Sequence, residues 1–175
     1  FAQLNPCFNA INERIVQSIK QVQKKTKRRR FNILDLGAGT GLQARMLVRE
    51  FPNANIYAVE QDEMFFEYHK KCVKPFPNVI ARCHNIVSFR SRQKADVIIV
   101  RLVYHHIPDK LKSRFLRNIR ANLKSRGRLI IVEECLGKYL NEFERRKRDE
   151  KYHRYRIELA ERTGDPAYVV YQTKI

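Results

Sequence analysis

The chain has 175 residues, a length that suits one domain with a real hydrophobic core. Lysine and arginine number 36 against 18 acidic residues, which gives a formal charge of +18. Such a charge favours a polyanion such as RNA as a partner, although a solvated basic surface gives the same sum. The sequence has no apolar run long enough to cross a membrane and no signal peptide, so we expect no membrane partner.

The four cysteines are scattered, and none belongs to a C-x-x-C pair: Cys7, Cys72, Cys83 and Cys135. This spacing argues against a zinc site and against a disulfide scaffold. We therefore expect reduced thiols, no metal ion and a cytoplasmic location. The sequence does not indicate an oligomeric state.

The first segment, 1–25, has apolar residues at helical spacing, which predicts an amphipathic helix with a stripe of Ile11, Ile15, Ile19 and Val22. A basic run without acids, Lys24–Arg30, follows this helix. The run is either a patch that contacts phosphates or a solvated linker into the first strand.

A glycine-rich turn follows a short apolar segment. Phe31–Leu36 predicts a buried strand, which ends in Gly37-Ala38-Gly39-Thr40-Gly41, and a helix is expected over Leu42–Phe51 with Thr40 as a candidate N-cap. Glycines admit backbone angles closed to other residues and let a ligand approach the main chain. Glu60 ends the second predicted strand, 55–59, where a carboxylate can accept hydrogen bonds from ribose hydroxyls. The pattern predicts a nucleotide-like ligand.

The string Leu34-Asp35-Leu36-Gly37-Ala38-Gly39-Thr40-Gly41 resembles the first motif of the class I S-adenosylmethionine-dependent methyltransferases, and Glu60 stands where that family has its second-strand acid. The resemblance covers about 31–134. It implies an α/β fold with a Rossmann-like, mostly parallel sheet and helices on both faces. It also implies S-adenosyl-L-methionine as cofactor, bound by Asp35, Gly37, Ala38, Gly39, Thr40, Gly41, Glu60, Gln61, Asn85, Ile86 and Arg101.

The second half of the cofactor region follows the third predicted strand, 79–83. Before it, Asp62 is expected to cap a helix over Glu63–Lys71, on which His69 is a surface or packing residue. The resemblance makes Asn85 a candidate contact to the adenine amino group and Ile86 a candidate contact to the ring. Asn85 is alternatively a turn residue.

The fourth predicted strand, 96–102, is almost continuously apolar and leads into Arg101-Leu102-Val103-Tyr104-His105-His106. This segment resembles the two-histidine turn of many small-molecule methyltransferases. Histidine is suited to proton transfer near pH 7, so His105 or His106 is the candidate catalytic base. The other interpretation is that the turn only shapes the wall of the acceptor pocket.

The last part of the core region is a helix over Lys110–Lys124, a turn at Ser125-Arg126-Gly127 and a fifth strand over 128–134. Eight basic residues and no acid lie between Lys110 and Arg128, and we expect them on the solvent face of this helix. A charged helix is expected over Tyr139–Arg162 and a sixth strand over Ala167–Tyr171. The closing hairpin of the family is then incomplete, or the natural chain continues past Ile175.

We therefore expect one methyltransferase domain over 1–175, with an N-terminal helix and linker (1–30), a cofactor-binding core (31–134) and a C-terminal helix and last strand (135–175). The first hypothesis is methyl transfer to an oxygen or nitrogen atom of a small molecule. The alternatives are an RNA methyltransferase and an inactive methyltransferase-like protein that binds RNA or the ribosome. The fourth strand is not followed by an Asn-Pro-Pro-Tyr type string, which disfavours amino-directed adenine methylation.

Overall fold

The structure is a computed structural model, which describes residues 8–26, 31–133, 138 and 140–163. The chain divides into two compact units, one over 15–133 and one that combines 1–14 with 134–175. The first unit holds the whole sheet. Every predicted site residue lies in this unit, so its geometry can be described by itself.

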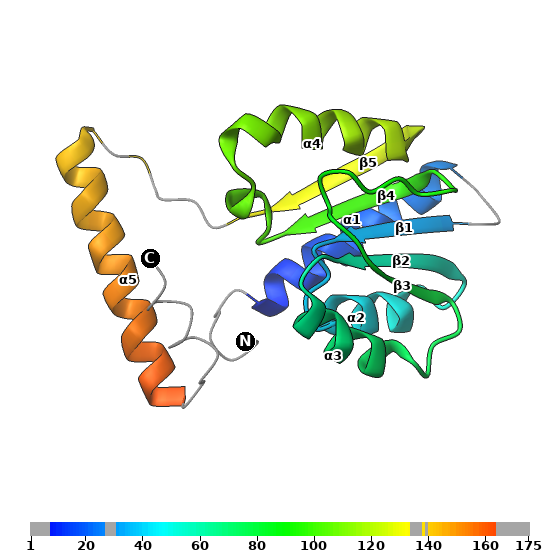
Figure 1. Ribbon diagram of the computed structural model, residues 1–175, viewed down its shortest axis with the longest axis horizontal. Helices are drawn as coiled ribbons and strands as arrows, with labels where there is room; N and C mark the ends of the chain where they lie inside the picture. The colour runs from blue at the N-terminus through cyan, green and yellow to red at the C-terminus, as the bar shows by residue number, and fades with distance from the viewer. Residues whose placement is uncertain (1–7, 27–30, 134–137, 139, 164–175) are drawn as a thin grey trace. The chain divides into compact units, whose positions relative to one another are not determined.

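Five strands form one sheet: β1 (Phe31–Leu36), β2 (Ala54–Glu60), β3 (Val79–Cys83), β4 (Ala95–Arg101) and β5 (Leu123–Val132). Their order across the sheet is β3-β2-β1-β4-β5, and every neighbouring pair is parallel (Figure 1). The chain therefore reverses its direction of travel across the sheet after β3, so the ends of β1 and β4 lie side by side. Ligands bind beside such a switch point in open α/β sheets. The predicted Rossmann-like parallel sheet is confirmed.

The helices follow the predicted order: α1 (Phe8–Thr26), α2 (Leu42–Glu50), α3 (Glu63–Val73), η1 (Tyr104–His106), α4 (Asp109–Asn122) and α5 (Glu142–Thr163). Asp62 caps α3 as expected, because its side chain accepts a hydrogen bond from Phe65 N at 3.0 Å. The prediction that Thr40 caps α2 is wrong. Gly41 holds that position in the left-handed conformation, without any side-chain hydrogen bond. The predicted sixth strand, 167–171, lies outside the described residues.

The start of β5 differs from the prediction. Helix α4 ends at Asn122, earlier than expected, and the predicted turn at Ser125-Arg126-Gly127 lies within β5. The ladder with β4 is irregular there, since Ala95 pairs with Leu123 but Val97 pairs with Arg128. Extra residues on β5 thus form an in-strand irregularity where the sequence pattern indicated a separate turn. The strand ends at Val132, so Glu133 follows it.

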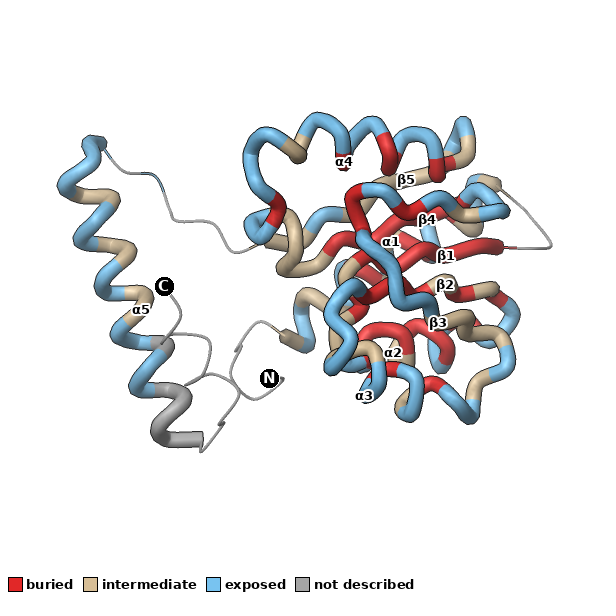
Figure 2. The backbone as a smooth tube through the Cα atoms, in the orientation of Figure 1, coloured by how far each residue is buried: buried red, intermediate tan, exposed pale blue. Residues whose placement is uncertain are grey.

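The core occupies both faces of the central strands, which are the most buried part of the sheet (Figure 2). On one face, Phe115 and Ile119 of α4 share a buried cluster with Leu34 and Ile98. Side chains alternate along a strand, so Ile33 points to the other face, together with Ile56 and Val97, which lie opposite it on the adjacent strands. These side chains are fully buried as well. Helices α1 and α2 supply further fully buried side chains, Ile15, Ile19, Ala44 and Leu47. The sheet is therefore covered on both faces.

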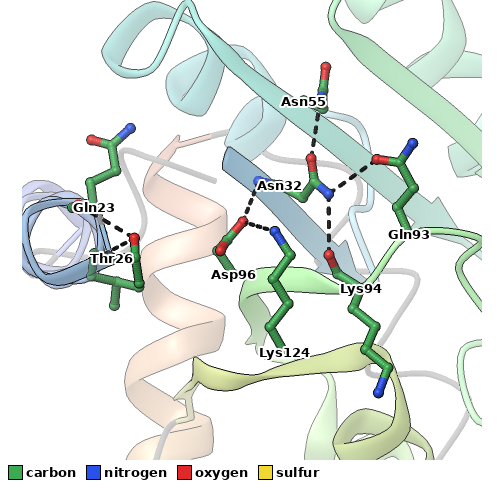
Figure 3. Close-up of polar contacts among 9 residues, drawn as sticks. Gln23, Thr26, Asn32, Asn55, Gln93, Lys94, Asp96 and Lys124 are labelled. Atoms are coloured by element: carbon green, nitrogen blue, oxygen red, sulfur yellow. Dashed lines mark hydrogen bonds and ion pairs between the residues drawn. The ribbon is translucent and has the colours of Figure 1, made fainter. Parts of the chain in front are cut away.

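The amino edge of the sheet, where the strands begin, is held by a polar network (Figure 3). Asn32 donates its backbone N–H to Asp96 Oδ2 at 2.9 Å, and Lys124 Nζ lies 2.6 Å from the same oxygen. The Asn32 amide also bonds the side chains of Gln93 and Asn55. Lys124 was expected on the solvent face of its helix. Instead, it neutralises the carboxylate of Asp96, whose side chain is 1% exposed.

No described helix meets the length and hydropathy needed to span a bilayer.

Candidate functional site

The predicted site residues lie at the opposite edge of the sheet, where the strands have their carboxyl ends. Parallel strands all end at the same edge, so the segments that follow β1, β2, β3 and β4 meet there. These segments are the glycine turn, Glu60, Asn85 and the two-histidine turn. A fifth segment, which begins with Glu133 after β5, reaches the same edge.

The glycine turn needs its glycines for backbone geometry. Gly37, Gly39 and Gly41 have φ of 80°, 54° and 86°, values that residues with a Cβ rarely adopt. The turn is tied to β2, because Gly37 N and Ala38 N both donate to Val59 O, at 2.8 and 3.0 Å. A Cβ added at Gly39 would meet no atom within 4 Å, so this point of the turn faces open space. Thr40 is exposed beside it.

Glu60 lies directly against the glycine turn. Its Oε2 accepts a hydrogen bond from Gly39 N at 2.7 Å, and its Oε1 accepts from Gln61 N and Asp62 N at 2.8 and 2.9 Å. The residue is 7% exposed. A carboxylate oxygen can accept two hydrogen bonds, so Oε2 still has capacity for a ligand hydroxyl. Glu60 is thus fixed in place by backbone donors and still able to accept a ribose hydroxyl.

Asp35 connects β1 to the helix that follows the turn. Its Oδ1 accepts a hydrogen bond from Gln43 Nε2 of α2 at 2.8 Å, while Oδ2 has no hydrogen-bond partner among the residues that the structure describes. Burial raises the pKa of Asp35 from 3.8 to about 7, against the opposing effects of Gln43 and of Arg101. Arg101, at the end of β4, is itself partly buried, and burial lowers its pKa. The two predicted site residues are therefore electrostatic neighbours.

An open pocket of about 500 Å³ adjoins Glu60, and it is lined by Gln61, Asp62, Cys83, His84 and Asn85. This volume lies within the range of small-molecule sites. The Asn85 side chain accepts a hydrogen bond from Val87 N at 2.9 Å, as a turn residue does, and the residue itself is exposed at the pocket. Ile86 is 3% exposed and belongs to the core cluster, so most of its side chain packs inside the protein.

The turn after β4 is strained and firmly held. Leu102 has a φ of 53°, the one positive φ among the described non-glycine residues. Val103 N and Tyr104 N both donate to Glu133 Oε1, at 3.0 and 2.6 Å, and His105 Nδ1 lies 2.6 Å from Glu133 Oε2. The Glu133 side chain is 13% exposed and that of His105 is 50% exposed. One carboxylate thus holds three successive residues of the turn.

The two histidines of the turn differ in environment. The rings of His105 and His106 are 3.9 Å apart between centroids. Burial and the neighbouring His105 lower the pKa of His106 below its ordinary value, with Glu133 opposing. The His105 ring contacts the carboxylate of Glu133 directly. Tyr104 packs its ring 6.3 Å from that of Phe115, so it belongs to the wall of the core.

Three contacts of this site escaped the sequence analysis. Glu133 was seen only as the end of a strand, and its role depends on a contact 28 residues away in the sequence, with His105. Val103 lies against Gly37, where an added Cβ would be 2.3 Å from Val103 Cγ2. His69 is fully buried beside Gly41, and burial lowers its pKa. The expectation of a packing histidine at this position fits the structure, whereas a surface position does not.

This combination of fold and site defines a class. A parallel sheet ends in a glycine turn with open space at Gly39, a buried acid fixed beside that turn, and an adjoining pocket. These features fit a nucleoside-containing cofactor, with Glu60 for the ribose and the pocket for the base. The domain is of the Rossmann-like, cofactor-binding type.

Comparison with known proteins identifies the family. The family model described as a methyltransferase domain matches residues 33–127, more than half of the chain. The chain therefore belongs to the class I S-adenosylmethionine-dependent methyltransferases, the family that its glycine motif resembles.

Two curated relatives and one solved structure illustrate the similarity. The chain is 30% identical over 121 residues to a demethylmenaquinone methyltransferase of Thermotoga maritima, covering 69% of this chain and 48% of the relative. It is 33% identical over 87 residues to a tRNA1(Val) (adenine(37)-N6)-methyltransferase of Pseudoalteromonas translucida, covering 47% of this chain and 38% of the relative. The plantazolicin methyltransferase BpumL, solved with SAH, superposes with a TM-score of 0.61 at 19% identity, over 81% of this chain and 58% of that one. The chain thus spans less than half the length of these two curated relatives.

Proposed function

We propose that the protein transfers a methyl group from S-adenosyl-L-methionine to an oxygen or nitrogen atom of a small molecule. The observation that carries this proposal is the contact of Glu60 with Gly39 at 2.7 Å, beside an open pocket. A fixed carboxylate next to a turn with room for a ligand supports a contact between Glu60 and the ribose of the family's cofactor. These intact features also favour an active enzyme over a methyltransferase-like protein that has lost cofactor binding.

When bound, S-adenosyl-L-methionine supplies an electrophilic methyl group on a positively charged sulfur. The residues of this chain then have to hold the cofactor, exclude water and take a proton from the acceptor. Asp35 and Gly37 lie on the side of β1, and His105 lies on the turn after the adjacent strand β4. The acceptor is therefore expected between the glycine turn and the two-histidine turn.

His105 or His106 is the proposed base for the acceptor proton. Both follow β4 at the carboxyl edge, and both are exposed in the single-turn helix η1. The pKa of His106 is lowered by burial, which favours its neutral form. A base aligned with the acceptor contributes about 10² to 10⁴ in rate.

A small-molecule acceptor is supported by the form of the site and by one relative. The histidine turn is a compact wall, because Glu133 accepts the backbone N–H groups of Val103 and Tyr104. The Thermotoga relative is named for demethylmenaquinone, a small molecule.

The proposal is tested first by binding and then by turnover. Titration calorimetry of the chain with S-adenosylhomocysteine should give saturable one-to-one binding. Incubation with S-adenosylmethionine carrying a tritiated methyl group and a panel of phenols, quinols and amines should then transfer the label to an acceptor. Absence of S-adenosylhomocysteine binding at millimolar concentration would overturn the proposal.

A second candidate acceptor is RNA, and one structural observation favours it. The described loops that enter the strands, 51–53, 74–78 and 88–94, contain no acid. They carry the exposed bases Lys74, Arg90, Arg92 and Lys94. The one acid that begins β4, Asp96, is buried and paired with Lys124. The Pseudoalteromonas relative is named for tRNA, which supports an RNA acceptor. The adenine N6 chemistry in its name is disfavoured for this chain, because no Asn-Pro-Pro-Tyr type string follows β4.

A further inference from the structure

We infer that Glu133 is the positioning residue on the acceptor side of the site: it selects His105 as the base and fixes which ring nitrogen of His105 accepts the proton. This inference rests on the proposed methyl transfer and goes further, because it chooses between the two histidines and adds a residue that follows β5.

The contacts of Glu133 determine how its oxygens are used. Oε1 already accepts the backbone N–H groups of Val103 and Tyr104, and Oε2 lies 2.6 Å from His105 Nδ1. A carboxylate held by several donors acts as an acceptor at both oxygens. The hydrogen of the third contact must therefore be on Nδ1 of His105, which donates it to Oε2.

The tautomer follows from this contact. In a neutral imidazole only one nitrogen carries a hydrogen, so Nδ1–H leaves Nε2 with a lone pair. The ring is half exposed at the carboxyl edge, whereas the carboxylate behind it is nearly buried. The nitrogen that can accept a proton is thus Nε2, and Glu133 occupies the other side of the ring.

The proton transfer balances without any further group. When the acceptor gains the methyl group, the methyl–sulfur bond would break with its electron pair left on the cofactor's sulfur. The O–H or N–H bond of the acceptor would break as well, and the proton would move to Nε2 of His105. The imidazole becomes an imidazolium, and the negative charge of Glu133 at 2.6 Å stabilises it. His105, whose Nδ1 lies 2.6 Å from Glu133 Oε2, is therefore the histidine that we assign as the base.

Glu133 also links the acceptor side to the cofactor side. The two backbone N–H groups that it accepts belong to the strained turn that begins at Leu102, with a φ of 53°. The side chain of Val103, in that turn, lies directly over Gly37. The carboxylate therefore fixes the position of His105 relative to the glycine turn, which is what alignment of a base requires.

The tautomer can be measured without knowing the acceptor. Histidine-selective ¹⁵N NMR of the full chain distinguishes Nδ1–H from Nε2–H rings. The spectra are recorded at a pH high enough for the histidine rings to be neutral. The His105 signals are identified by their absence in His105→Asn. We expect His105 in the wild type to be mainly the Nδ1–H tautomer, and a mainly Nε2–H ring would overturn the inference.

Glu133→Gln keeps the shape of the side chain but can present an amide N–H to His105. We expect the Nδ1–H population to fall several-fold in this variant. The matched control is Asp109→Asn, which removes an exposed carboxylate close in sequence that is bonded to Lys112. The control should leave the His105 tautomer unchanged. If Glu133→Gln leaves it unchanged as well, the inference fails.

Two further readouts separate this inference from a purely structural role. Once an acceptor is found, Glu133→Gln should lower kcat by about 10² with little change in affinity for S-adenosylhomocysteine. In a His105→Ala background the same change should have almost no further effect. Additive effects would instead assign Glu133 a structural role alone. If the wild type does not bind S-adenosylhomocysteine, the proposed function is refuted, whereas the result on the His105 tautomer still stands.

Discussion

Val103, after β4, lies so close to Gly37, after β1, that a Cβ on the glycine would be 2.3 Å from Val103 Cγ2. The two residues follow adjacent parallel strands, and their contact joins the cofactor turn to the two-histidine turn. A glycine is required at position 37 for two reasons, its φ of 80° and this lack of space.

The variant Gly37→Ala is expected to destabilise the fold. A side chain at positive φ costs about 1–2 kcal/mol, and overpacking against a fixed neighbour adds about 1–3 kcal/mol. The free energy of unfolding, measured by urea denaturation, should therefore fall by about 2–5 kcal/mol. The double variant Gly37→Ala/Val103→Ala removes the clash but keeps the strain. It should be less destabilised than the sum of the two single variants predicts.

The matched change Gly39→Ala should separate stability from binding. Gly39 also has a positive φ, 54°, but no atom lies within 4 Å of an added Cβ. We expect a loss of stability of only about 1–2 kcal/mol, from backbone strain. The new methyl group would occupy the space in front of the turn, so the affinity for S-adenosylhomocysteine should fall at least ten-fold by calorimetry. Unchanged affinity would mean that the cofactor does not approach the turn here.

Glu60→Ala should weaken cofactor binding. The change removes a carboxylate that accepts from Gly39 N at 2.7 Å and is expected to accept from the ribose. A hydrogen bond to a charged group contributes about 1.5–3 kcal/mol, so the dissociation constant for S-adenosylhomocysteine should rise roughly 10- to 150-fold. The control is Glu67→Gln, which alters an exposed acid on α3. If Glu60→Ala binds as tightly as this control, the role given to Glu60 is wrong.

Asp35 should give stability a definite pH dependence. Its pKa is raised from 3.8 to about 7, so between these values the folded state holds a proton that the unfolded state has lost. The free energy of unfolding then decreases as pH rises through this window and levels off above about 7. The free energy of unfolding of the wild type, measured relative to that of Asp35→Asn, should fall by about 3 kcal/mol between pH 5 and pH 8.

The comparison with Asp35→Asn is needed because His69 acts with the opposite sign. Its pKa is lowered by burial, so its protonation favours unfolding as pH falls below its ordinary value of 6.5. That effect is present in both proteins and cancels in the difference between them. Equal pH dependence of the two proteins in urea denaturation would show that Asp35 ionises freely in the folded state.

The sequence predicted the parts of the fold that depend on local pattern. The apolar runs of β1 and β4 and the glycine turn each form a continuous signal, and these two strands lie within a residue or two of their expected places. The end of α4 was missed because the chain passes directly from Asn122 into the sheet, where Leu123 pairs with Ala95 of β4. This strand pairing is a tertiary contact, which no local pattern reports.

The same distinction applies to the site. The cofactor side was predictable because Gly37, Gly39 and Glu60 follow a motif with fixed spacing. The acceptor side was only partly predictable. The adjacent histidines were visible, but the choice between them depends on Glu133, which reaches His105 from β5. The burial that raises the pKa of Asp35 likewise comes from packing, and the sequence gives only the identity of the residue.

The bases at the amino edge of the sheet can be tested for RNA binding. If Arg90, Arg92 and Lys94 contact RNA phosphates, reversing all three to Glu should weaken binding of a single-stranded oligouridylate. Each lost contact should reduce the slope of log affinity against log salt by about 0.7, so the slope should become shallower by about 2. The affinity for S-adenosylhomocysteine should not change, because the loop 88–94 enters β4 at the edge opposite Glu60.

A charge-matched control decides between a site and a diffuse field. The variant Arg146→Glu/Lys147→Glu/Arg154→Glu makes the same change of net charge on exposed residues of α5. An amino-edge site predicts that this control binds the oligonucleotide nearly as well as the wild type. Equal weakening in both variants would mean that RNA responds only to the overall charge of +18. Lack of wild-type binding at low salt would refute the RNA candidate and leave the small-molecule acceptor.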